Sequence, residues 1–159
     1  MRSLLRFAIA TVLALGGWAA PPRAGAANQD TTADSFFGQP DFTHNSANNG
    51  GLHATSLSGA AGAALDLQGN LYLADTVNNR VLEYDTPLTA GAAADRVFGQ
   101  PDFTHSAINN GGLSAASLHL PNGLAVDSAG NLYLADAANN RVLEYDWALF
   151  KVELPLIRR

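Results

Sequence analysis

Two aspartate–arginine pairs stand out in this chain as residues that could do chemistry. Asp75 is followed five residues later by Arg80, and Asp136 is followed at the same spacing by Arg141. A carboxylate and a guanidinium so placed could bind a ligand, or could hydrogen-bond to each other and hold a turn together. Binding sites are usually built from residues that differ between repeated units, whereas these recur identically. We therefore predict that all four are structural turn residues.

Four polar loop residues are weaker candidates for ligand binding. His44 and His105 each end a copy of the segment FGQPDFTH, and Asn49 and Asn110 each lie in a copy of NNGG. A zinc site needs ligand atoms that converge at about 2.0 to 2.2 Å from the ion, and the spacing of the histidines does not enforce this. Asn-Gly segments also form turns without any ligand. We predict no metal site and no cofactor.

Motifs and composition narrow the function classes further. The motifs G-x-S-x-G, H-E-x-x-H and GxxxxGK[ST] do not occur, so the sequence gives no case for a nucleophile or a phosphate-binding loop. The absence of cysteine excludes disulfides and thiolate zinc sites. The net charge of −5 becomes −8 when residues 1–26, with three arginines and no acidic residue, are subtracted. Such an acidic chain is not expected to bind nucleic acid.

The elements that position these residues belong to a repeat of 61 residues. Of the 50 positions from 36 to 85, 34 are identical with those from 97 to 146, without any insertion. A period in this range indicates stacked supersecondary units, such as a solenoid or a propeller. We place the first repeat at residues 36–96 and the second at 97–146.

Each repeat reads as an antiparallel meander of short strands. In the second repeat these are 124–126, 132–135 and 142–145, and residues 95–99 predict a fourth strand for the first repeat. A glycine late in each hairpin loop supplies a positive φ, and asparagines in the next turn tolerate the left-handed region. Because LYLA is apolar at consecutive positions, its strand should be covered on both faces.

The motifs G-x-A-V-D, G-N-L-Y-L-A-D and N-N-R-V resemble the NHL repeat, over residues 61–85 and 123–146. The resemblance implies β-propeller blades, and six blades are common in that family. The FGQPDF extension is similar to that of secreted bacterial NHL-repeat proteins. We therefore expect an all-β chain of about two four-stranded antiparallel blades, which is an incomplete propeller because closure needs roughly 4 to 8 blades.

The two ends of the chain differ from the repeats. Residues 1–26 combine two early arginines, a run of fourteen uncharged residues and the sequence Ala-Gly-Ala, which predicts a signal peptide cleaved near Ala26. The run is too short for a membrane span, so we expect a secreted or periplasmic protein without a span in the mature chain. Residues 27–34 read as a linker, 35–146 as the two repeats, and 147–159 as a divergent tail.

The resemblance favours a binding or scaffolding module with a protein or saccharide ligand. The alternative is part of a propeller enzyme of the lyase or lactone hydrolase type. Residues 35–38 match 96–99 and form a fourth-strand segment placed ahead of the first meander, while the second meander lacks one. Either the chain is a piece of a longer propeller, or this segment completes the last blade of another copy in a homo-oligomer, in which three chains would supply six blades.

Overall fold

The first repeat folds into a four-stranded antiparallel sheet in the computed structural model, which describes residues 31–86 and 88–146. Its strands follow one another along the chain in the order β1-β2-β3-β4. They are β1 (Ala60–Leu65), β2 (Leu71–Asp75), β3 (Arg80–Tyr84) and β4 (Arg96–Phe98). The expected meander with a fourth strand is confirmed.

The second repeat forms a three-stranded antiparallel sheet in the order β5-β6-β7. The strands are β5 (Pro121–Val126), β6 (Leu132–Asp136) and β7 (Arg141–Tyr145). β5 begins three residues earlier than its apolar core 124–126 suggested, because Pro121 pairs with Asp136 across an irregularity in register. As expected, this sheet has no fourth strand among the described residues, so β7 is its edge.

The turns follow the conformations that their residue types favour. Gly69 and Gly130 have φ of 89° and 90° in the two hairpin loops, where a side chain would be strained. Short 3₁₀ helices, η1 (Thr76–Asn78) and η2 (Ala137–Asn139), follow β2 and β6. Asn79 and Asn140 end them in the left-handed region, with φ of 52° and 54°. Each of these helices returns the chain sharply into the next strand.

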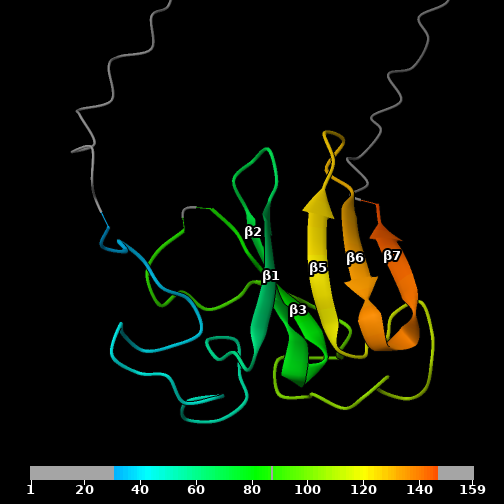
Figure 1. Cartoon of the computed structure of the whole chain (residues 1–159), viewed down its shortest axis with the longest axis horizontal. Helices are drawn as coiled ribbons and strands as arrows, with labels where there is room; N and C mark the ends of the chain where they lie inside the picture. The colour runs from blue at the N-terminus through cyan, green and yellow to red at the C-terminus, as the bar shows by residue number, and fades with distance from the viewer. Residues whose placement is uncertain (1–30, 87, 147–159) are drawn as a thin grey trace, which may run out of the picture. The chain divides into compact units, whose positions relative to one another are not determined.

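The two sheets pack against each other, with β5 next to β1 (Figure 1). One hydrophobic core lies between them. Its buried members are Tyr72, Ala74, Val81, Leu118, Leu132 and Leu134. At the closest approach Gly62 of β1 meets the backbone of Asn122, and any side chain at position 62 would collide with that carbonyl oxygen. The sheets are therefore stacked like neighbouring blades.

The other face of the first sheet is covered by the segment 34–59, cyan in Figure 1, and by the loop before β4. A second core forms there around Leu57, Leu82, Tyr84 and Ala94, with Phe37 packed against it. The ring of Phe37 lies edge-on to that of Tyr84 at 5.0 Å between centroids. Both faces of this sheet are thus covered, as the apolar run in β2 predicted, whereas the same run in β6 leaves Tyr133 and Ala135 half-buried within the described chain.

Residues 35–38, expected as a strand segment, form no strand within the described chain. The fold class is as predicted, with two antiparallel sheets, almost no helix and the character of incomplete propeller blades. Among the described residues no helix is long and apolar enough to cross a bilayer. The predicted signal peptide 1–26 and tail 147–159 lie outside the described residues.

Candidate functional site

The Asp75–Arg80 pair lies at the turn between β2 and β3, and both side chains are fully buried. Arg80 Nε donates to Asp75 Oδ2 at 2.7 Å, and Asp75 Oδ1 accepts the Ser58 backbone N–H at 2.6 Å. The other guanidinium nitrogens donate to three backbone carbonyls, those of His53, Ser56 and Phe103. The pair therefore ties this turn to the loops before and after the first sheet.

The Asp136–Arg141 pair repeats most of this arrangement. Arg141 Nε donates to Asp136 Oδ2 at 2.7 Å, and Asp136 Oδ1 accepts the His119 backbone N–H at 2.7 Å. Asp136 is fully buried, but the Arg141 side chain is 25% exposed. Within the described residues, the other hydrogen bonds of the Arg141 guanidinium go to the preceding loop, to the backbone carbonyls of Ser114 and Ser117. The structural role of both pairs stays a prediction that variants can test.

The two candidate histidines lie in exposed loops and bond to their own turns. His44 Nδ1 is 2.7 Å from Asp41 Oδ1, and His105 Nδ1 is 2.7 Å from Asp102 Oδ1. Each aspartate also accepts bonds from the threonine two residues on. The bond to its histidine, followed by the threonine bonds, holds the pKa of Asp41 well below its ordinary value and lowers that of Asp102 to about 2.

The asparagine-glycine loops contain a contact that sequence reasoning missed. Asn48 and Asn78 exchange side-chain amide hydrogen bonds at 2.9 and 2.8 Å, and Asn109 and Asn139 do the same in the second repeat. The signal was present in the sequence, since both partners recur with the 61-residue period. The neighbouring candidates Asn49 and Asn110 take no part in these pairs.

Asn49 lines a shallow loop cleft of about 420 Å³, together with His53 and Thr55. The other three candidates, His44, His105 and Asn110, do not line it. The four loop candidates therefore do not form one common site in the structure. The structure places a different set of residues together, at the seam between the sheets.

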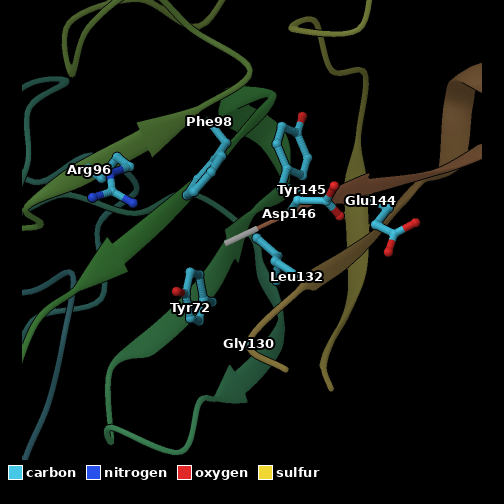
Figure 2. A pocket seen from close by; sticks show the side chains of 8 residues that line it. All are labelled: Tyr72, Arg96, Phe98, Gly130, Leu132, Glu144, Tyr145 and Asp146. Atoms are coloured by element: carbon cyan, nitrogen blue, oxygen red, sulfur yellow. The ribbon is translucent and has the colours of Figure 1, made fainter. Parts of the chain in front are cut away.

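That seam opens into a cleft of about 370 Å³, shown in Figure 2. Tyr72 and Phe98 come from the first sheet, and Leu132 and Tyr145 face them from the second. The remaining lining residues are Arg96, Gly130, Glu144 and Asp146. The rings of Phe98 and Tyr145 pack edge-on at 5.0 Å between centroids. The cleft therefore has an aromatic floor.

The charged residues around this aromatic floor differ in how far partners neutralise them. Arg96 Nη1 lies 3.0 Å from Glu83 Oε2, so its charge is already matched by a buried carboxylate. Burial raises the pKa of Glu83, and Arg96 opposes that shift. Glu144 Oε1 accepts the hydroxyl of Tyr133 at 2.8 Å, a bond that raises the pKa of Tyr133 to about 12. The Glu144 carboxylate is thus turned toward Tyr133 on the far face of the second sheet, and the exposed Asp146 remains as an acidic residue at the rim of the cleft.

The residues that line this cleft can bind a ligand by stacking and by charge attraction. Aromatic floors with carboxylates suit cations and polar side chains. Within the described ranges no group of three histidine or acidic side chains is placed to hold a metal ion. No cofactor site was expected from the sequence. The cleft itself could not be foreseen, because its residues come from β2, β4, β6 and β7.

Comparison with known proteins agrees with this blade architecture. Residues 118–145 match the family model described as NHL repeat, which spans the end of the long connection and the strands β5 to β7. A search of curated proteins gave no match. Together with the two stacked sheets, the match indicates blades of the propeller type and suggests a binding or scaffolding module, because NHL repeats commonly mediate protein interactions.

Proposed function

We propose that the chain is an exported binding module that holds a protein partner through a basic side chain seated in the cleft between its two sheets. The cleft in Figure 2 carries this proposal, because rings of Tyr72, Phe98 and Tyr145 meet there beside the acidic residue Asp146. A guanidinium is planar, stacks on aromatic faces and donates to carboxylates, so arginine has the chemistry that the cleft complements.

The overall charge supports a basic partner. Without residues 1–26 the chain carries a net charge of −8, and a field of this sign raises the association rate of cationic ligands. The volume of about 370 Å³ suits one long side chain and its flanking backbone rather than a large metabolite. Export is supported by the charged, apolar and small-residue segments of residues 1–26.

The proposal is tested by calorimetric titration of the purified exported chain with an acetylated Gly-Arg-Gly amide peptide. We expect measurable binding that weakens as salt increases, because exposed charges are screened. The variant Asp146→Asn should weaken binding by about twofold to fivefold, which corresponds to one exposed charge contact. A peptide with Glu in place of Arg should not bind.

The repeat supplies a matched control in Asp85→Asn. Asp85 occupies the same position in the first repeat and is also exposed, but it does not line the cleft. This variant should bind the arginine peptide as the parent does. Equal losses in both variants, or binding of a neutral oligosaccharide in place of the peptide, would contradict the proposal and favour a saccharide ligand.

A further inference from the structure

The contact between the two repeats inside this chain uses a defined set of hydrogen bonds. Asn79 lies at its centre, donating to the Ser106 carbonyl at 3.0 Å and accepting the Leu120 backbone N–H at 2.9 Å. The Gln100 side chain donates to the Asn79 carbonyl at 2.9 Å. Beside it, Arg80 Nη1 donates to the Phe103 carbonyl at 2.6 Å. Turn residues of the first repeat thus bind the connecting segment of the second.

Counterparts of both halves of this contact recur near the two ends of the described chain, where they do not meet each other. Asn140 and Arg141 take the positions of Asn79 and Arg80, yet within residues 31–146 no hydrogen bond involves the Asn140 side chain or Arg141 Nη1. The complementary positions lie near the N-terminus. They are Gln39, Phe42, Asn45 and Gly59, which match Gln100, Phe103, Ser106 and Leu120.

The apolar faces show the same relation. Tyr72, Ala74 and Val81 are at most 2% exposed, because the second sheet covers them. Their counterparts Tyr133, Ala135 and Val142 lie on the far face of the second sheet, where Val142 is 67% exposed. A face that is covered in one repeat is therefore open in the other, although the residue types are identical.

The N-terminal segment already has the conformation needed to cover such a face. Phe37 packs on Tyr84 at 5.0 Å and 64°, and its counterpart Phe98 packs on Tyr145 at 5.0 Å and 69°. A side chain on Gly38 would collide with Leu57, just as one on the matching Gly99 would collide with Leu118. The segment 36–59 therefore sits on the first sheet as 97–120 sits on the second.

We propose that the open face of the second sheet binds the N-terminal segment and first sheet of a second copy of this chain, head to tail. The pairing of β3 with β4 gives the register, because Val81 pairs with Phe98, Leu82 with Val97 and Glu83 with Arg96. Shifted by one repeat, β7 receives a fourth strand from the second copy. The pairs are Val142 with Phe37, Leu143 with Phe36 and Glu144 with Ser35.

The proposed contact between copies uses the same surfaces as the internal contact between the two repeats. Each copy that is added therefore presents the open face of its own second sheet to the next copy. A heterologous contact of this kind forms a ring when its rotation closes. Propellers close with roughly 4 to 8 blades, so two to four copies would complete a ring. The inference goes beyond the proposed function and does not depend on what the cleft binds.

Cysteine cross-linking tests the register directly, because the chain has no cysteine of its own. One batch carries Ser35→Cys with a size tag, and a second batch carries Glu144→Cys without it. Both positions are exposed in the single chain. Under mild oxidation we expect a mixed disulfide dimer when the batches are combined, and a yield at least about tenfold lower from either alone. Absence of the mixed product, or equal yields from the single batches, would overturn the proposal.

A glycine variant separates assembly from folding. Gly62 lies against the Asn122 backbone in the internal contact, whereas a side chain on its counterpart Gly123 meets only the Cβ of Ala135, at 3.4 Å. Gly123→Ala should therefore leave thermal unfolding of the chain intact but block the head-to-tail contact, raising the apparent dissociation constant about tenfold or more. Light scattering measures this against the parent. A parent chain that is monomeric when cooperatively folded would contradict the inference, as would a Gly123→Ala variant that assembles normally.

Discussion

The strands β3 and β7 have the same sequence, Arg-Val-Leu-Glu-Tyr, and different surroundings. All five residues are buried in β3, whereas in β7 half-buried and exposed positions alternate. Val81 is fully buried and Val142 is 67% exposed. Since the sequences are identical, the difference comes entirely from what packs on each sheet. β3 lies between two layers and has β4 as a partner, and β7 has neither on its outer side.

The largest expected difference between the two repeats lies at their turn arginines, of which Arg80 is buried and Arg141 is partly exposed. Arg80→Ala removes a guanidinium that binds Asp75 and three carbonyls in a fully buried site, so we expect a loss of about 3 to 5 kcal/mol in the free energy of unfolding. Arg141→Ala should cost less, about 1 to 3 kcal/mol, because that side chain is partly exposed and contacts one loop. Urea unfolding at low protein concentration measures both. Equal losses would show that exposure does not decide the cost.

Val81 and Val142 test in the same way whether exposure decides the cost of removing an apolar side chain. Val81→Ala leaves a cavity between the sheets and should cost about 2 kcal/mol. Val142→Ala should change unfolding of the dilute chain by less than about 0.5 kcal/mol, since exposed positions contribute little. The pair is compared by thermal unfolding at matched concentrations. A large loss at Val142 under dilute conditions would indicate that its face is already covered.

A smaller difference between β3 and β7 is expected from the charge partners of their glutamates. Glu83 has Arg96 as its partner on β4, but the matching pair for Glu144 is Ser35. Ser35→Arg should strengthen self-association by about threefold to tenfold, with a benefit that fades at high salt. Gln68→Arg, in an exposed hairpin loop, adds the same charge elsewhere and should have no effect. Sedimentation at two salt concentrations distinguishes the variants. An equal gain in self-association from both would show that net charge alone causes the effect.

The exposed loops should behave alike in both repeats, because their contacts are local. The pKa values of Asp41 and Asp102 are lowered, chiefly by the bond to the adjacent histidine, and that of Asp102 lies at about 2. A depressed carboxylate pKa means that the loop is stabilised above pH of about 4 and loses this contribution as the pH falls toward 2. Carboxyl NMR titration should show both groups ionised at pH 4. An ordinary value for either would contradict the bonded geometry.

The sequence was sufficient for the features that depend on neighbours along the chain. The apolar runs located every strand of the meanders, and the positive φ values of Gly69 and Asn79 follow from residue type. Contacts across the repeat were out of reach, because nothing local to Asn79 indicates that it meets Leu120. Residues 35–38 resemble a strand but need a partner strand, and the described chain supplies none. The candidate cleft combines four strands and could not be predicted for the same reason.

The Asn79 contact has a consequence for how such a chain could lengthen. Asn79 lies in the first repeat and its partners lie in the second, and each repeat contains positions that match both sides, so a unit inserted in frame would arrive with both halves of the contact. Stability in repeat proteins is approximately a sum of unit and interface contributions. Tandem duplication would therefore add one interface for each unit, without requiring compensating changes elsewhere. An array of linked units could therefore grow by gene duplication alone.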